Sequence, residues 1–148
     1  MFGGTFNPPH QGHINLLLAL QVQYHIDLIT LLPNAISPLK LDKPPIANHH
    51  RINMLKLCIS DYPQLCIDDF ELHQPPPSYT VNTLKHFAQK HQVFFIIGYD
   101  SYLNLPKWYQ LETILDLCHL IVLPRSSSNH NLYDLPKHIV QNTITQKD

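Results

Sequence analysis

Glycine, tryptophan and charged residues are all scarce in this sequence of 148 residues, and no apolar run is long enough to cross a membrane. With 14% charged residues and a formal net charge of −1, the chain has no basic stretch of the kind that binds nucleic acid, so any phosphate binding must be local. Its three cysteines, Cys58, Cys66 and Cys118, form neither a CxxC pair nor an even set, and we expect buried thiols in a reducing compartment. Because no signal peptide precedes the first motif, these absences predict a cytoplasmic protein without a membrane segment.

Histidine and proline are the abundant residues, with 11 and 13 copies respectively. Most of the histidines are scattered along the chain, which argues against a dedicated metal-binding tract. A hydrophobic content of 44% is typical of a folded chain, and the length suits one ordinary domain with one core. We therefore expect a single domain over residues 1–148.

Short apolar runs alternate with helical patterns along the chain. A helix is predicted over Gln11–Tyr24, where apolar residues recur at helical spacing. These residues are Ile14, Leu17, Leu18 and Val22. Strands are predicted within residues 27–33, 64–72 (as one strand or two), 92–100, 119–124 and 139–145. Three further helices are predicted. They cover residues 49–61, the segment from a Ser-Tyr-Thr cap at 78–80 to about residue 90, and residues 110–118. This alternation predicts an α/β fold, a parallel sheet with helices on both faces, in which ligands bind beyond the carboxyl ends of the strands.

The most informative segment is GGTFNPPHQGH, which occupies Gly3–His13 directly after a short strand stub at Met1–Phe2. Its glycines let the backbone approach a phosphate, and the helix that follows offers free N–H groups and a partial positive charge. His10 and His13 stand one helical turn apart, so both rings can point the same way, and Gly12 between them leaves room for a ligand. Two imidazoles suit the excess negative charge of a pentacoordinate phosphorus. Since no Ser, Cys or Lys nucleophile stands beside them, we expect one phosphate to attack another directly.

This segment resembles the signature of the HxGH nucleotidylyltransferases, and most closely the string G-G-T-F-[DN]-P-x-H-x-G-H of the bacterial nicotinate-mononucleotide adenylyltransferases. The resemblance implies a Rossmann-like nucleotidylyltransferase fold and an ATP-binding enzyme of NAD biosynthesis. The implied reaction joins ATP to nicotinate mononucleotide and gives nicotinate adenine dinucleotide and pyrophosphate, with Mg²⁺ bound to the ATP. The resemblance covers the chain from Phe2 to about Arg125.

Three further segments extend the resemblance. SPLK resembles the family's P-P-H-K loop and puts Lys40 at the phosphate-binding lysine, although Leu39 stands where the family has His. PSYTVNTL and the GYDS…W…IL segment are close to the family's P-S-Y-T-x-x-T-L and I-I-G-x-D-S-L…W…I-L. RINML resembles the family's R-x-x-M-L, so Arg51 is either a phosphate partner or a surface charge on a helix.

The resemblance implies a role for each matching residue. The implied catalytic residues are His10, His13 and Lys40. The implied ATP-binding residues are Gly3, Gly4, Thr5, Phe6, His10, Gly12, His13, Gly98, Asp100 and Arg125, with Asp100 on a ribose hydroxyl or helping to organise the metal. The implied residues for nicotinate mononucleotide are Asn7, Lys40, Ser78, Tyr79, Thr80, Trp108 and Tyr109. The resemblance implies that Trp108 stacks on the pyridine ring. It also implies that the pyridine carboxylate is held by N–H groups at the helix start near Thr80 and by the backbone of Trp108 and Tyr109. No residue is implied as a dedicated metal ligand.

Two features depart from the family pattern. Only Met1 and Phe2 precede the glycine pair, where the family has several more apolar residues. The family's I-S-[SA]-T-x-I-R segment, which binds the ATP phosphates, has no counterpart, because SSSNHN at residues 126–131 lacks its Ile and Arg frame. We therefore expect a member truncated at both ends, with the carboxyl-terminal part of the domain missing and an incomplete ATP triphosphate site.

Three other functions stay open on the sequence. Another small-molecule nucleotidylyltransferase, such as the pantetheine-phosphate type, is disfavoured by Ser78–Thr80 and Trp108, which fit a pyridine carboxylate. A nucleotide-binding remnant without catalysis would explain the missing segment. A His-rich metal-binding protein is disfavoured because the ligand spacing is wrong.

Overall fold

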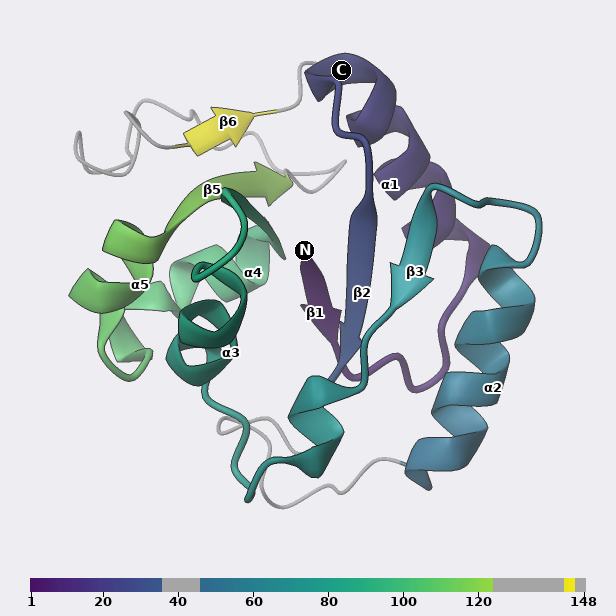
Figure 1. Cartoon of the computed structure of the whole chain (residues 1–148), viewed down its shortest axis with the longest axis horizontal. Coiled ribbons are helices and arrows are strands. Elements are labelled where there is room, and N and C mark those ends of the chain that lie inside the picture. Colours follow the sequence, from purple (N-terminus) through teal and green to yellow (C-terminus); the bar gives the residue numbers. More distant parts are fainter. Residues whose placement is uncertain (36–45, 124–142, 146–148) are drawn as a thin grey trace. The chain divides into compact units, whose positions relative to one another are not determined.

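A computed structural model of the chain describes residues 1–35, 46–123 and 143–145. The chain forms two compact units, unit 1 over Met1–Ser78 and unit 2 over Tyr79–Asp148, whose elements are shown in Figure 1. Each unit has parallel strands joined through helices, so the alternation of strand and helix predicted from the sequence is confirmed in both.

The described residues of unit 1 include three parallel strands in the order β3-β2-β1. Strand β2 lies between the other two, because Leu31 pairs with Phe2 of β1 while Ile29 pairs with Leu65 of β3. Helices α1 and α2 contact each other and lie on the same side of these strands (Figure 1). The elements of unit 1 are β1 (Phe2–Gly4), α1 (Gln11–Tyr24), β2 (Ile29–Pro33), α2 (Asn48–Ile59), β3 (Leu65–Ile67) and the 3₁₀ helix η1 (Phe70–His73).

The core of unit 1 is built from fully buried apolar side chains of α1, α2 and β2. They are Ile14, Leu17, Leu20, Ile29, Leu31, Leu32 and Leu55. The predicted apolar face of α1 is wrong at Val22, which is 79% exposed. At 100° per residue the buried stripe runs through Leu17, Leu20 and Gln21, and Val22 falls well outside it.

The described residues of unit 2 include three parallel strands in the order β4-β5-β6. Strands β4 and β5 pair along their whole length, from Val93 with Cys118 to Gly98 with Leu123. Helix α3 contacts α5, and α4 follows β4 without a loop because Gly98 is its N-cap residue. The elements of unit 2 are α3 (Thr80–Phe87), β4 (Val93–Gly98), α4 (Tyr99–Leu103), the 3₁₀ helix η2 (Leu105–Lys107), α5 (Leu111–Leu117), β5 (Cys118–Leu123) and β6 (Thr143–Thr145).

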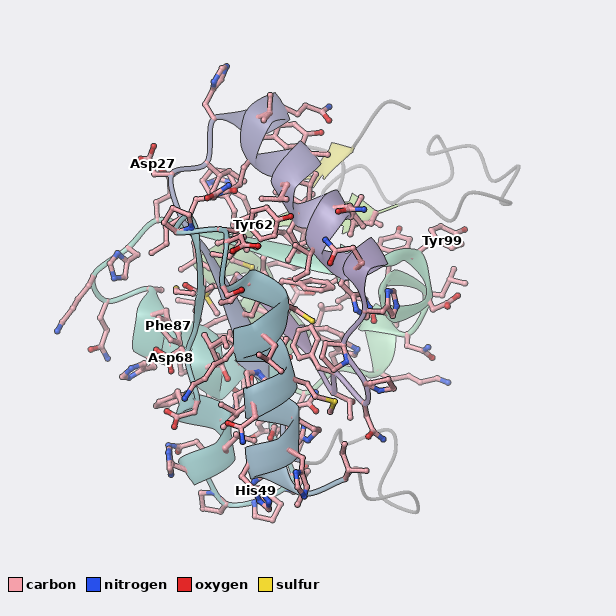
Figure 2. All side chains as sticks on the ribbon, turned by 90° about the vertical axis from the view of Figure 1, so that its right-hand side faces the viewer. Asp27, His49, Tyr62, Asp68, Phe87 and Tyr99 are labelled. Carbon is pink, nitrogen blue, oxygen red and sulfur yellow. The ribbon has the colours of Figure 1, made fainter. Side chains whose placement is uncertain are left out.

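The carboxyl ends of β1 and β2 lie at the same edge of unit 1. Gly4 pairs with Pro33, the last residue of β2, and the amide of Asn34 donates a hydrogen bond of 3.0 Å to the carbonyl of Gly4. Figure 2 shows Asp27, which precedes β2, and His49, at the start of α2, at opposite ends of the unit. Helix α2 therefore begins at the edge where β1 and β2 end, beside the segment that follows Gly4.

In unit 1 one local prediction is wrong, and one alternative that the sequence left open is decided. Strand β1 runs over Phe2–Gly4, so the glycine pair lies in the strand and not in the loop after it. The 64–72 segment holds one strand followed by the 3₁₀ helix η1, and not a second strand. The reason is turn chemistry, because the carboxylate Oδ1 of Asp68 accepts a hydrogen bond of 2.8 Å from the amide of Phe70 and turns the chain.

The three cysteines differ in burial, and the prediction of buried thiols holds for Cys118 alone. Cys58 and Cys66 are half-buried, and all three are free thiols. Burial raises the pKa of the Cys118 thiol to about 12, and its Sγ donates to the carbonyl of Ile114 at 3.3 Å.

We expect Cys118 to resist alkylation by iodoacetamide at pH 8 in the folded protein, while Cys58 and Cys66 react. At a pKa of about 12 the reactive thiolate fraction of Cys118 is about 10⁻⁴ at that pH, and the thiol is also sterically covered. Peptide mass spectrometry after timed labelling measures this, with a urea-unfolded sample as the control in which all three react. Equal labelling rates for Cys118 and Cys58 in the folded protein would contradict it.

Candidate functional site

The segment Gly3–His13 folds around the side chain of Phe6. Phe6 is 5% exposed, and its backbone φ of 49° lies in the left-handed region. Its ring covers Gly4, where a Cβ atom would stand 3.3 Å from the ring atom Cζ, and it meets the ring of Phe2 edge-on at 5.8 Å between centroids. A left-handed phenylalanine is strained, so the contacts around it must hold it in place.

His10 and His13 stack on each other at the start of helix α1. Their ring centroids are 3.6 Å apart and their planes differ by 22°. His10 is the exposed N-cap residue, whereas His13 is half-buried and meets the ring of Phe6 edge-on at 5.9 Å. The one-turn spacing thus places the two imidazoles together, as the sequence indicated.

A hydrogen bond fixes the ring orientation of His13. The backbone N–H of His10 donates to Nδ1 of His13 over an N···N distance of 3.4 Å. Because Nδ1 accepts, the neutral ring carries its proton on Nε2. Burial of the ring, and then the neighbouring His10, lower the pKa of His13 below its ordinary value of 6.5. At neutral pH His13 is therefore an uncharged imidazole with an Nε2–H donor.

Gly12 makes room for a neighbouring side chain. A Cβ atom at this position would stand 3.0 Å from Nδ1 and 3.2 Å from Cε1 of His10. The sequence pattern predicts a ligand in this space, but the ring of His10 fills it. Gly12 thus leaves room for the stacked imidazole pair itself.

Arg51 is neither a phosphate partner nor a surface charge, so both interpretations of this residue are wrong. Its side chain is 0% exposed, and burial lowers the pKa of the guanidinium. Nη1 donates to the carbonyl oxygens of Thr5 and Asn34, each at 2.7 Å. The cation is used inside the fold, where it joins the segment after β1 to the end of β2.

Three polar side chains in unit 1 bear on ligand binding. The amide oxygen Oδ1 of Asn7 accepts a hydrogen bond of 3.4 Å from the backbone of Ile46, so this exposed residue is partly engaged within the protein. Oδ1 of Asn34 and Oγ of Ser78 are buried and have no hydrogen-bond partner among the described residues. Buried polar atoms normally have a partner, so these two oxygens are candidate contacts for a bound polar group.

Four of the residues predicted to bind nicotinate mononucleotide lie in unit 2, at the start of α3 and directly after η2. Tyr79 is the N-cap residue of α3, and it makes no side-chain capping hydrogen bond, so the predicted Ser-Tyr-Thr cap is not formed there. Its ring lies against that of Tyr109, with centroids 4.9 Å apart. The half-exposed ring of Trp108 meets Phe95 edge-on at 6.1 Å. Thr80, the first residue of α3, adds the N–H groups that a helix start presents.

Gln110 is a residue of this region that the sequence patterns do not single out. It precedes α5 with a left-handed φ of 54°, accepts a hydrogen bond of 3.3 Å from Nζ of Lys85, and donates one of 3.2 Å to the hydroxyl of Tyr109. It therefore ties Tyr109 to helix α3. No sequence signal marks this position, because the left-handed conformation is usually taken by Gly or Asn.

The other predicted residues follow strand β4 or fall outside the description. A Cβ atom on Gly98 would meet no atom of the described residues within 4 Å. Asp100 is exposed in the first turn of α4. Lys40 and Arg125 lie outside the described residues.

Neither a metal-binding cluster nor a membrane-spanning helix is present in the described part of the chain. No group of three or more His, Cys, Asp or Glu side chains in residues 1–35, 46–123 and 143–145 is placed to hold a metal ion. None of the helices in the same ranges has both the length and the apolar character needed to span a membrane.

The chain is similar in sequence to two bacterial proteins that bear the name probable nicotinate-nucleotide adenylyltransferase. The protein of Shewanella frigidimarina is 41% identical over 128 residues, and that of Serratia proteamaculans is 39% identical over 141 residues. The alignments cover 84% and 93% of this chain. They cover 60% and 63% of those relatives, so the chain spans about three fifths of their length.

Solved structures share the fold. The nicotinic acid mononucleotide adenylyltransferase of Plasmodium falciparum, complexed with NaAD, matches 99% of this chain and 74% of its own with a TM-score of 0.73. The same protein complexed with APC gives a TM-score of 0.70. The identities are 19% and 18%, so these matches establish the fold alone, and they confirm the Rossmann-like nucleotidylyltransferase fold predicted from the sequence. Because the cytidylyltransferase-like family model matches residues 1–147, the chain belongs to the cytidylyltransferase-like family.

Proposed function

We propose that this protein transfers the adenylyl group of ATP to nicotinate mononucleotide, giving nicotinate adenine dinucleotide and pyrophosphate, a step of NAD biosynthesis. The observation that carries the proposal is the stacked His10–His13 pair at the mouth of helix α1, with the Nε2–H of His13 as a donor. The names of the bacterial relatives support the choice of substrates.

In the proposed reaction an oxygen of the mononucleotide phosphate attacks the α-phosphorus of ATP in line with the leaving pyrophosphate. The new P–O bond forms as the bond between the α-phosphorus and the bridging oxygen breaks, and no covalent enzyme intermediate is needed. Negative charge builds up on the oxygens of the pentacoordinate phosphorus. His10, His13 and Lys40 stabilise that charge, and the free N–H groups at the start of α1 contribute to the same stabilisation. Most of the acceleration comes from positioning and electrostatics.

Mg²⁺ is proposed to arrive with ATP, held mainly by phosphate oxygens, where it neutralises charge on the transferring and leaving groups. Asp100, exposed in the first turn of α4, is the residue proposed to bond a ribose hydroxyl or to orient a water of the metal.

The mononucleotide is proposed to bind through residues at the start of α3 and after η2. The pyridine carboxylate accepts hydrogen bonds from N–H groups at the start of α3, near Thr80, and from the backbone of Trp108 and Tyr109. The indole of Trp108 stacks on the pyridine ring. The packed tyrosine rings of Tyr79 and Tyr109 support this choice, because they keep Tyr109 close to the helix start.

The proposed setting is the cytoplasm. All three cysteines are free thiols, as expected in a reducing compartment.

The first experiment is to measure pyrophosphate release by the 148-residue chain from ATP, nicotinate mononucleotide and Mg²⁺. We expect release that depends on both substrates, and quenching of Trp108 fluorescence by the mononucleotide, since Trp108 is the single tryptophan. Phosphopantetheine and nicotinamide mononucleotide serve as alternative acceptors. Quenching without release would favour the second candidate function, a protein that binds the mononucleotide without catalysis. Release with phosphopantetheine alone would replace the proposed acceptor.

A further inference from the structure

We propose that Arg51 is a positioning residue of the candidate site, which holds the Thr5–Phe6 peptide so that the ring of Phe6 fixes His13 in its stack on His10. The positional part of this inference stands on unit 1 alone. Its consequence for turnover rests on the proposed function.

The guanidinium is anchored on one side by the start of helix α2. Its Nε donates to the carbonyl oxygen of Ile46 at 3.1 Å, and Nη2 donates to the amide oxygen Oδ1 of Asn48 at 2.5 Å. Arg51 itself lies in the first turn of α2, so its backbone is fixed by the helix. Together with these two hydrogen bonds, this holds the planar guanidinium group in one orientation. A side chain fixed in this way can act as a rigid support.

On its other side the guanidinium holds two backbone carbonyls that are far apart in sequence. Nη1 donates to Thr5 and to Asn34, both at 2.7 Å. Hydrogen bonds from a cation are about twice as strong as neutral ones, and these are buried with the Arg51 side chain. The guanidinium therefore fixes the carbonyl of Thr5 relative to the end of β2.

The carbonyl of Thr5 belongs to the peptide that leads into the strained residue Phe6. With φ at 49°, Phe6 persists in the left-handed region only if its surroundings determine both its backbone and its ring. Arg51 holds the backbone through Thr5, and Phe2 and Gly4 enclose the ring. Loss of the Arg51 contact would release the restraint on the backbone side.

The ring of Phe6 in turn forms a wall against His13. The two rings meet edge-on, with centroids 5.9 Å apart and planes at 86°, and Phe2 lies 6.0 Å from the same imidazole. Burial by these neighbours agrees with the lowered pKa of His13. A continuous line of contacts thus runs from Arg51 through Thr5 and Phe6 to His13.

The alternative is that Arg51 merely stabilises the core of unit 1. Leu55 provides the matched comparison, because it lies one helical turn further along α2 and is also 0% exposed. Leu55→Ala weakens the same helix through a cavity and touches neither carbonyl. Arg51→Lys keeps the charge and the aliphatic stem and loses the fork that bridges Thr5 and Asn34.

The test is the ring-proton resonance of His13 at fixed pH in protein labelled with ¹³C-histidine, assigned by its disappearance in His13→Gln. We expect Arg51→Lys to shift this resonance and to leave that of the exposed His73 in place, whereas Leu55→Ala lowers the unfolding temperature without the shift. Phe6→Leu alone should also shift the His13 resonance. The double variant Arg51→Lys/Phe6→Leu should show nearly the same shift as Phe6→Leu alone, because both substitutions act along one line of contacts.

A milder variant keeps the test decisive if Arg51→Lys fails to fold. Asn48 is exposed, and Asn48→Ala removes one acceptor of the guanidinium without opening the core, so a smaller shift of the His13 resonance is expected. An unchanged His13 resonance in the folded variants, or an equal shift in Leu55→Ala, overturns the inference. So does simple addition of the Arg51→Lys and Phe6→Leu shifts.

Turnover gives the second measurement. If the chain releases pyrophosphate, Arg51→Lys should lower kcat by on the order of 10²-fold, as a misplacement of about 1 Å does, with little change in KM for the mononucleotide. An inactive wild-type chain would count against the proposed function alone, because the resonance measurement needs no substrate. A kcat unchanged in Arg51→Lys would overturn the positioning role in turnover.

Discussion

Replacing His13 by Ala is expected to lower pyrophosphate release by about 10²–10³-fold, the usual cost of removing one preorganised donor to a developing oxyanion. The Nε2–H of His13 is the donor proposed for this role, because Nδ1 already accepts from the backbone of His10. The ring is also held by its stack on His10 and by the edge of Phe6, so no reorganisation is needed at the moment of reaction. Steady-state kinetics with both substrates varied measure kcat directly.

The loss should fall on kcat and spare binding of the mononucleotide. The residues proposed for its pyridine ring belong to unit 2, and quenching of Trp108 should therefore have nearly the same midpoint in His13→Ala. His73→Ala is the matched control, because His73 is an exposed histidine of unit 1 whose ring contacts Asp69 at 3.0 Å. Full turnover in His13→Ala, or an equal loss in His73→Ala, would refute the role of His13.

The lowered pKa of His13 also predicts how stability depends on pH. In the folded protein the ring stays neutral below pH 6.5, where the unfolded chain already takes up a proton at this position. The unfolded state then binds more protons, so the free energy of unfolding falls as the pH drops from about 6.5 towards the folded pKa. His13→Gln should reduce this slope in urea titrations between these pH values, and an unchanged slope would contradict the assigned pKa shift.

Much of the fold follows from sequence patterns that are local. Helix α1 has the predicted bounds Gln11–Tyr24, because a proline-rich loop precedes it and a long apolar repeat fills it. Strand β4 is recognisable because a continuous apolar run ends at Gly98. The 3₁₀ helix η1 was missed because the Asp68 carboxylate, a single side chain, decides between a turn and a second strand.

The candidate site is harder to predict because its key interactions join distant segments. Arg51 would ordinarily be assigned to the surface, since an isolated charge is costly to bury. Its burial depends on the carbonyls of Thr5 and Asn34 converging on one nitrogen, which no local pattern encodes. The spacing of His10 and His13 does predict that the rings lie close together, because both positions belong to one helical turn.

Gly12→Ala is expected to lower turnover by on the order of 10²-fold while leaving the protein at least as stable as wild type. Because activity falls and stability does not, this variant is the sharpest test of the stacked pair. A Cβ atom at Gly12 would stand 3.0 Å from Nδ1 and 3.2 Å from Cε1 of His10, tighter than most Cβ contacts in proteins, so we expect the exposed ring of His10 to shift and to disturb its stack on His13. Alanine in place of glycine favours a helix by up to about 1 kcal/mol, and Gly12 is the second residue of α1. Displacing an exposed ring costs little in return.

The double variant decides whether the effect runs through His10. If the added methyl group acts only by moving that ring, Gly12→Ala should change neither kcat nor KM further in a His10→Ala background. Asn15→Ala, an exposed substitution in the same helix, controls for helix propensity and should keep turnover close to wild type. Urea titration gives the stabilities, and the ¹³C-histidine spectrum shows whether the His10 resonance moves in Gly12→Ala. Equal turnover in Gly12→Ala and wild type, together with a moved His10 resonance, would show that the stack of His10 on His13 is not needed for transfer.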